Sequence, residues 1–257
     1  MHQDFADRTG AALVVGGSGA IGRTVVRMLG ERGSDVVAGY HGSAARAEAA
    51  VAEATAHGVR GAAVALDVRD EDSCSAVVRH VVAAYGGLHT LVYAAGPHVP
   101  MVHLSRVSPA EFRNQLIADA AGFFNIAQPA LPALRAAGGN IVAVTTAATT
   151  RFPVRDGLSA GPKGAVEALV RGLAAEEGRF GVRVNCVGPG MLTDGMAETL
   201  IGSGDLDERA LEVTRANIPL RRFGSAADIA EAVCFLASDR AGFISGQKLD
   251  VDGGYGA

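Results

Sequence analysis

Short runs of apolar residues alternate along the chain with longer stretches in which apolar residues recur at helical spacing. This alternation is typical of βαβ units, in which a parallel sheet carries helices on both faces. The runs predict seven strands, at Ala11–Val15, Asp35–Tyr40, Gly61–Leu66, Leu88–Ala94, Asn140–Thr145, Val182–Val187 and Lys248–Val251. The intervening stretches predict helices, among them Ala20–Arg32, Ala44–His57, Asp72–Tyr85, Pro109–Ala136, Ala165–Arg179 and Ala226–Ser238.

Seven strands in this order predict an α/β fold: a single-domain, Rossmann-like, doubly wound seven-stranded parallel sheet with helices on both faces. With 257 residues, 49% hydrophobic and 19% charged, the chain can bury one sizeable core. We therefore expect one domain over residues 1–257. In such sheets ligands bind beyond the carboxyl ends of the strands, and every motif described below follows a strand at that edge.

The stretch Met191–Arg215 breaks the alternation with Gly195, Gly202, Gly204 and several polar residues. Because it follows a strand at the ligand edge, we interpret residues 191–215 as a lid over the site. The alternative is a surface excursion without function.

Charge and cysteine content narrow the range of partners. The formal net charge of −4, without a local run of arginines, excludes an electrostatic footprint for nucleic acid or an anionic membrane. No apolar run approaches the roughly 18 residues that span a bilayer, and Met1–Gly10 lacks the apolar segment of a signal peptide. Cys74, Cys186 and Cys234 are too widely spaced for a disulfide framework or a metal site. We expect a cytoplasmic protein without a metal, acting on a small neutral or anionic metabolite.

The first predicted strand runs into a glycine-rich turn that opens a helix. Gly17, Gly19 and Gly22 satisfy the Gly-x-Gly-x-x-Gly spacing, which lets backbone approach a pyrophosphate at a helix N-terminus. A site specific for NAD places a carboxylate about 20 residues further on, to hold the ribose 2′-hydroxyl. Residues Gly39–Ser43 contain none. The sequence therefore favours NADP(H), with a 2′-phosphate received by Ser18, His41 or Arg46.

Further short motifs follow in a fixed order and extend this pattern over nearly the whole chain. They are Asp67-Val68, Ala94-Ala95-Gly96, Pro189-Gly190 with Thr193, Pro219–Gly224, Asp228–Ala230, Ser245–Gln247 and Val251–Gly254. With the glycine turn they make the chain resemble the short-chain dehydrogenase/reductase family, close to its acyl-carrier-protein ketoreductase branch. It departs from the family at Val15, Ala20 and Tyr93, which replace a threonine, a glycine and an asparagine.

The resemblance implies a set of cofactor contacts. Asp67 and Val68 would contact the adenine, Ala94 to Gly96 the adenosine ribose region, and Pro189 to Thr193 the nicotinamide and phosphates. The full set implied is Gly16, Ser18, Gly19, Ile21, Gly22, Tyr40, His41, Asp67, Val68, Ala94, Ala95, Gly96, Lys163, Pro189, Gly190, Leu192 and Thr193.

The resemblance also locates the catalytic residues. In the family a tyrosine acidified by a lysine exchanges a proton with the substrate oxygen, a serine orients that oxygen, and an asparagine holds a water. The lysine falls on Lys163, the tyrosine on Ser159, the serine on Thr146 and the asparagine on Asp119. Only the lysine is retained, and it is expected to bind the ribose hydroxyls of the cofactor.

Each replacement has a functional and a structural interpretation. The Thr146 hydroxyl can orient a carbonyl as a serine does, or Thr146 can simply serve its strand. Asp119 can favour a charged Lys163 or be a solvated helix carboxylate. Ser159 is a poor general acid and could be a helix N-cap, with Pro162 delaying the helix. The best replacement acid is His98, because imidazole has a suitable pKa. Behind it stand His103, Arg151 and Arg155.

Several functions remain open at this point. The first is an NADPH-dependent reductase with unusual proton chemistry, acting on a small-molecule, carrier-bound or polyketide-like carbonyl. The second is a non-catalytic partner subunit of a hetero-oligomer, and the third is a dehydratase, cyclase or isomerase on the same scaffold. A Ser159–Lys163 hydrolase ranks last, because no oxyanion hole is evident. By resemblance we expect a homotetramer, or a heteromer with another subunit of the family.

Overall fold

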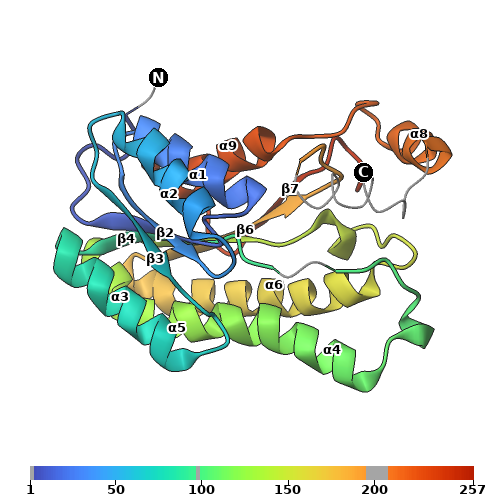
Figure 1. The fold of residues 1–257 in the computed structure, drawn as a ribbon, viewed down its shortest axis with the longest axis horizontal. Helices are drawn as coiled ribbons and strands as arrows, with labels where there is room; N and C mark the ends of the chain where they lie inside the picture. The colour runs from blue at the N-terminus through green and yellow to red at the C-terminus, as the bar shows by residue number, and fades with distance from the viewer. Residues whose placement is uncertain (1–2, 97–98, 195–207) are drawn as a thin grey trace.

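The structure, a computed structural model, describes residues 3–96, 99–194 and 208–257. Its centre is one seven-stranded parallel sheet of order β3-β2-β1-β4-β5-β6-β7 (Figure 1). The strands are β1 Ala11–Val15, β2 Asp35–Tyr40, β3 Gly61–Ala65, β4 Leu88–Tyr93, β5 Asn140–Val144, β6 Arg183–Pro189 and β7 Lys248–Val251. The predicted fold class is confirmed.

The strand order creates a crevice at one edge of the sheet. The chain begins in the middle with β1, moves outward to β3, and returns to place β4 on the other side of β1. The connections that follow β1 and β4 therefore leave in opposite directions. Ligands of doubly wound sheets bind at this switch point, where the glycine turn after β1 meets the loop after β4.

Helices cover both faces of the sheet (Figure 1). One layer holds α1 Ala20–Glu31, α2 Ala44–Thr55 and α9 Ala226–Ala237, and the other holds α3 Glu71–Tyr85, α5 Gly122–Ala137 and α6 Gly157–Glu177. Alternate residues of β1 serve the two layers, since side chains of a strand point to opposite faces. Ala12 and Val14 pack under the first layer, and Leu13 and Val15 under the second.

The predicted helix Pro109–Ala136 contains an irregularity. It consists of α4 Pro109–Leu116, a π-helical turn η2 over Ile117–Ala121, and α5. The hydroxyl of Tyr93 lies 3.2 and 3.1 Å from the carbonyl oxygens of Ala118 and Asp119 and donates to them. A buried tyrosine thus supports the widened turn, and such turns occur frequently at functional sites.

Helix α6 begins at Gly157, eight residues before the predicted start at Ala165. Ser159 is therefore inside the first turn, and its interpretation as an N-cap is wrong, as is the delay expected from Pro162. Packing explains the early start. A Cβ at Gly157 would collide with Leu104, and one at Gly161 would lie 3.3 Å from Phe112, so the glycines that disfavour a helix locally allow close approach here.

The remaining elements are short or fall outside the two main layers. Helix α8, Glu208–Asn217, occupies the end of the predicted lid, where no helix was expected. Residues 195–207 of that stretch lie outside the described residues. Among the helices described, none is long and apolar enough to cross a membrane. The short 3₁₀ turns are η1 Leu104–Arg106, η3 Ala147–Thr149, η4 Gly178–Phe180 and η5 Asp239–Ala241.

The three cysteines are buried and form no disulfide, as expected from their spacing. Burial raises the pKa of Cys74 to about 11 and those of Cys186 and Cys234 to about 12. They are neutral thiols of the core and not nucleophiles, because the thiolate is the reactive form.

Candidate active site

The turn between β1 and α1 has the shape of a phosphate cradle. Gly16 has φ +84, and a Cβ there would lie 2.6 Å from the carbonyl oxygen of Ala94. A Cβ at Gly22 would collide with the carbonyl oxygen of Gly16. Gly19 occupies the N-cap position of α1 and provides no side-chain cap, so the first N–H groups of this helix remain available to an anion. These residues fit the pyrophosphate of a dinucleotide.

Basic side chains gather beyond the ends of β2 and β3. Arg69 donates from Nε and Nη2 to Asp67 at 2.9 and 2.7 Å, and His41 Nε2 lies 3.6 Å from the same carboxylate. The hydrogen bonds from Arg69 lower the pKa of Asp67 to about 2. The side chains of Ser18 and Arg46 make no hydrogen bond to any described residue. Arg69 was not predicted, although it stands only two residues after Asp67.

The centre of the site is a buried ion pair between Lys163 and Asp119. Nζ of Lys163 lies 2.7 Å from Oδ1 of Asp119 and donates to the carbonyl oxygen of Ala95 at 3.2 Å. Gln115 donates to Oδ2 of Asp119 at 3.0 Å. The Asp119 side chain is 1% exposed and that of Lys163 11%. The interpretation of Asp119 as a solvated carboxylate is therefore wrong.

Gly96 and the π turn place this pair at the cofactor edge. Gly96 belongs to the loop after β4. A Cβ there would lie 3.3 Å from Lys163 Nζ and 3.6 Å from Asp119 Oδ1, so the ion pair packs directly on the backbone of this loop. Asp119 stands in the π turn that Tyr93 supports. Burial raises the pKa of Tyr93, which is therefore a neutral donor and not an acid.

Ser159 and Thr146 present hydroxyl groups near the start of α6. Ser159 is half-buried and its side chain has no partner among the described residues. Thr146 accepts a hydrogen bond from the Ala148 amide at 3.1 Å, which caps η3 and leaves its own hydroxyl hydrogen free to donate. Thr146 can therefore combine its two predicted roles.

Asp156 is a further acidic residue that sequence reasoning missed. It occupies the N-cap position of α6, yet its side chain makes no cap hydrogen bond and has no other described partner. Asp156, Ser159 and Lys163 follow one another at three- and four-residue spacing, which places them along one side of the helix. Burial raises the pKa of Asp156 to about 6. With the start of α6 known, the three-residue spacing between Asp156 and Ser159 would have pointed to Asp156 as a site residue.

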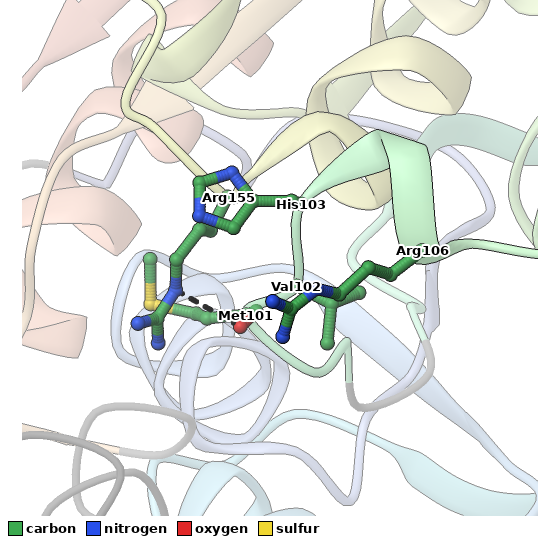
Figure 2. A pocket seen from close by; sticks show the side chains of 5 residues that line it. All are labelled: Met101, Val102, His103, Arg106 and Arg155. Atoms are coloured by element: carbon green, nitrogen blue, oxygen red, sulfur yellow. Dashed lines mark hydrogen bonds between the residues drawn. The ribbon is translucent and has the colours of Figure 1, made fainter.

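The other candidate proton donors named above have different surroundings where the structure describes them. His98 is outside the described residues. Arg151 donates to the carbonyl oxygen of Tyr255 at 2.8 Å and stacks on its ring, so its side chain anchors the C-terminal segment. His103 and Arg155 line a pocket between the loops that follow β4 and β5 (Figure 2).

The segment after β6 is held against the start of α9. Leu192 forms a β-bridge with Gly224, and the Thr193 amide donates to the Gly224 carbonyl at 2.9 Å. Gly190 packs so closely on Asp252 that a Cβ would lie 2.6 Å from its Cα. The predicted contacts Pro189 to Thr193 thus follow β6 at the same carboxyl edge of the parallel sheet as the glycine turn after β1.

A family model described as enoyl-(acyl carrier protein) reductase matches residues 16–256 of the chain. The chain belongs to the short-chain dehydrogenase/reductase family. It is 36% identical to the 3-oxoacyl-acyl-carrier-protein reductase FabG of Staphylococcus aureus, over 96% of this chain and 98% of that protein. It is 33% identical to versicolorin reductase 1 of Dothistroma septosporum, over 95% of this chain and 94% of that protein.

Solved structures of the short-chain dehydrogenase/reductase family have the same fold. A short-chain dehydrogenase from Burkholderia cenocepacia, solved in complex with NADP, has a TM-score of 0.88 and 31% identity, over 98% of this chain and 100% of that one. A short-chain type dehydrogenase/reductase from Mycobacterium ulcerans has a TM-score of 0.91 and 27% identity, over 98% and 91%. The resemblance predicted from the motifs is confirmed.

The ion pair predicts a measurable coupling between two helices of this short-chain dehydrogenase/reductase. Asp119→Leu leaves the Lys163 ammonium buried without a counter-charge, and Lys163→Met does the same to the carboxylate. We expect each to lower the free energy of unfolding by about 3–5 kcal/mol. The double variant buries no charge and should lose less than the sum of the two. Urea denaturation measures all four proteins, and losses that add to within about 0.5 kcal/mol would contradict the coupling.

Proposed function

We propose that the protein is an atypical NADPH-dependent reductase that reduces a carbonyl of a small-molecule, polyketide-like or carrier-bound substrate. The observation that carries the proposal is the retained Lys163, fixed beside Gly96 at the edge where the glycine cradle lies. FabG and versicolorin reductase 1 are reductases by name, which supports the reaction class. We place the protein in the cytoplasm, and cell fractionation tests this.

The nucleotide proposed is NADP(H), held through the residues that the family resemblance implies. The Burkholderia relative was solved with NADP. In this chain no carboxylate stands at Tyr40–Ser43, and His41, Arg46 and Arg69 offer positive charge or hydrogen bonds to a 2′-phosphate. When bound, this cofactor would supply the hydride that reaches the carbonyl carbon.

Two residues of this chain then position the cofactor and the substrate. Lys163, oriented by Asp119 and the Ala95 carbonyl, donates hydrogen bonds to the ribose hydroxyls. Thr146 donates to the carbonyl oxygen of the substrate and orients it. Positioning of this kind accounts for a large part of enzymatic rate enhancement, whereas one general acid contributes typically about 10²–10⁴-fold.

The proton for the substrate oxygen comes from Asp156 in this proposal. An alkyl hydroxyl such as that of Ser159 is too weak an acid, while a carboxyl with a pKa of about 6 is poised near the operating pH. The proton leaves the Asp156 carboxyl for the oxygen as the carbon receives the hydride, and solvent reprotonates the carboxylate. Asp156 thereby replaces His98 as the first candidate for the missing acid.

A non-catalytic partner subunit and a non-redox enzyme remain the alternatives, because the family's tyrosine is absent. For assembly we propose a homotetramer, supported by the exposed apolar side chains of Ile117 in the π turn and Phe124 on α5. Light scattering of the purified chain tests this. Co-purification with a second dehydrogenase subunit would instead support the heteromer.

The nucleotide preference is directly measurable. NADPH should bind at least about tenfold more tightly than NADH, because a 2′-phosphate gains charge-assisted hydrogen bonds. Calorimetry with both nucleotides measures the ratio. Arg69→Gln should reduce it, whereas Arg79→Gln, an exposed change on α3, should not. Equal affinities in the wild type would exclude the assignment.

Asp156 gives the reduction a characteristic pH dependence. Because the acid form is required, the single-turnover rate of ketone reduction should fall as pH rises through about 6. Asp156→Asn should remove this dependence and slow reduction by about 10²-fold or more. Ser159→Tyr added to Asp156→Asn should recover part of the rate, since a phenol then stands beside Lys163. Equal rates for the wild type and Asp156→Asn would rule out Asp156 as the donor.

The same carboxyl has a stability signature that requires no turnover. Its pKa in the folded state is raised above that of the unfolded chain, so its stabilising contribution is complete below about pH 4 and is lost as pH rises through about 6. Asp156→Asn, which never ionises, should therefore gain Tm relative to the wild type between about pH 4 and pH 8. A Tm difference independent of pH would show that Asp156 is not buried as described.

A further inference from the structure

A pocket of about 280 Å³ opens between the loop after β4 and the loop before α6. It is lined by Met101, Val102, His103, Arg106 and Arg155. In the view of Figure 2 the guanidinium groups of Arg155 and Arg106 lie on either side of the Met101 carbonyl oxygen. Three of the five lining residues are basic or can become so, and none is acidic.

These basic groups have no counter-charge in the described part of the chain. Arg106 makes no ion pair and no side-chain hydrogen bond there, and neither does His103. Arg155 uses Nε to donate to the Met101 carbonyl at 3.1 Å, which leaves both of its terminal nitrogens free. Two guanidinium groups around one hollow repel each other, and an oxyanion placed between them would remove the repulsion and accept hydrogen bonds from both.

The backbone of Arg155 is strained. Its φ is +75, in the left-handed region that favours glycine and is unfavourable for other residues. Such strain persists where the surrounding structure enforces it, and it is concentrated at ligand clamps and active sites. Here the hydrogen bond to Met101 fixes the guanidinium at the pocket wall.

The pocket adjoins the row formed by Asp156, Ser159 and Lys163 along α6. Arg155 directly precedes Asp156, and Gly157 packs against Leu104 of the turn between His103 and Arg106. Leu104, Phe152 and Val154, which are close in sequence to the lining residues, have exposed apolar side chains, the last of them 71% exposed. These side chains are available to contact an extended substrate whose carbonyl reached Asp156.

We propose that Arg106 and Arg155, with His103 beside them, bind an oxyanion at the far end of the substrate, joined to the reacting carbonyl by an extended chain. The proposal rests on the function proposed above, and it specifies the substrate class. Two sources share this chemistry. One is the phosphodiester of a phosphopantetheine arm, and the other is a terminal carboxylate on a small keto acid.

The test compares ligands that differ only in the anion. A non-reducible pantetheine thioether is titrated with and without its 4′-phosphate, and a keto acid as the free acid or as the methyl ester, all in the presence of NADP⁺, which has no hydride to transfer. Calorimetry should show one anionic ligand binding about tenfold or more tightly than its neutral partner. Preference for the phosphate identifies the arm as the source, and preference for the free acid identifies the carboxylate. Equal affinity within both pairs would overturn the proposal.

Variants separate this site from the rest of the protein. Arg106→Gln with Arg155→Gly should abolish the discrimination while keeping the wild-type affinity for NADPH, and glycine at 155 also relieves the backbone strain. Arg79→Gln is the matched control and should discriminate as the wild type does. Discrimination that survives in the double variant would overturn the proposal. Because binding is measured without turnover, failed reduction with intact discrimination would contradict only the proposed function.

Discussion

The buried ion pair between Lys163 and Asp119 is the constraint on which the site depends. A charge removed from water requires a partner and hydrogen bonds, or it becomes strongly destabilising. Lys163 comes from α6, Asp119 from the π turn before α5, and the Ala95 carbonyl from the loop after β4. Gln115 satisfies the second carboxylate oxygen. One charge pair therefore aligns three segments of the chain at the carboxyl edge of the sheet.

Compared with the family pattern, the site has a retained half and an altered half. The retained half comprises the glycine cradle, Gly96 and Lys163, which position the dinucleotide in the proposed function. The proton-transfer half has changed, with Ser159 in place of a tyrosine and a carboxyl, Asp156, three residues earlier on the same side of the helix. In the proposed function the acid lies at the start of α6, next to Arg155 and the basic pocket. Substrate recognition and protonation would then take place at neighbouring residues of this chain.

The strands and the cofactor turn could be predicted because buried parallel strands and glycine turns follow local rules. The start of α6 could not, because Gly157, Gly161 and Pro162 disfavour a helix locally, and the packing of the two glycines on Leu104 and Phe112 is visible only in the structure. Ion-pair partners such as Lys163 and Asp119 were placed near each other by family resemblance. Their burial and the supporting roles of Gln115 and Tyr93 depend on the π turn, and no pattern in the sequence predicted that turn.

The central claim is that this chain transfers hydride although the family's tyrosine is missing. The most direct measurement is a single turnover with NADPH deuterated at C4 of the nicotinamide, followed by mass spectrometry of the product. The account predicts an alcohol that carries one deuterium on the former carbonyl carbon, for at least one ketone or thioester substrate. Tight binding of NADPH without deuterium transfer to any of the ketones and acyl thioesters tried would contradict it.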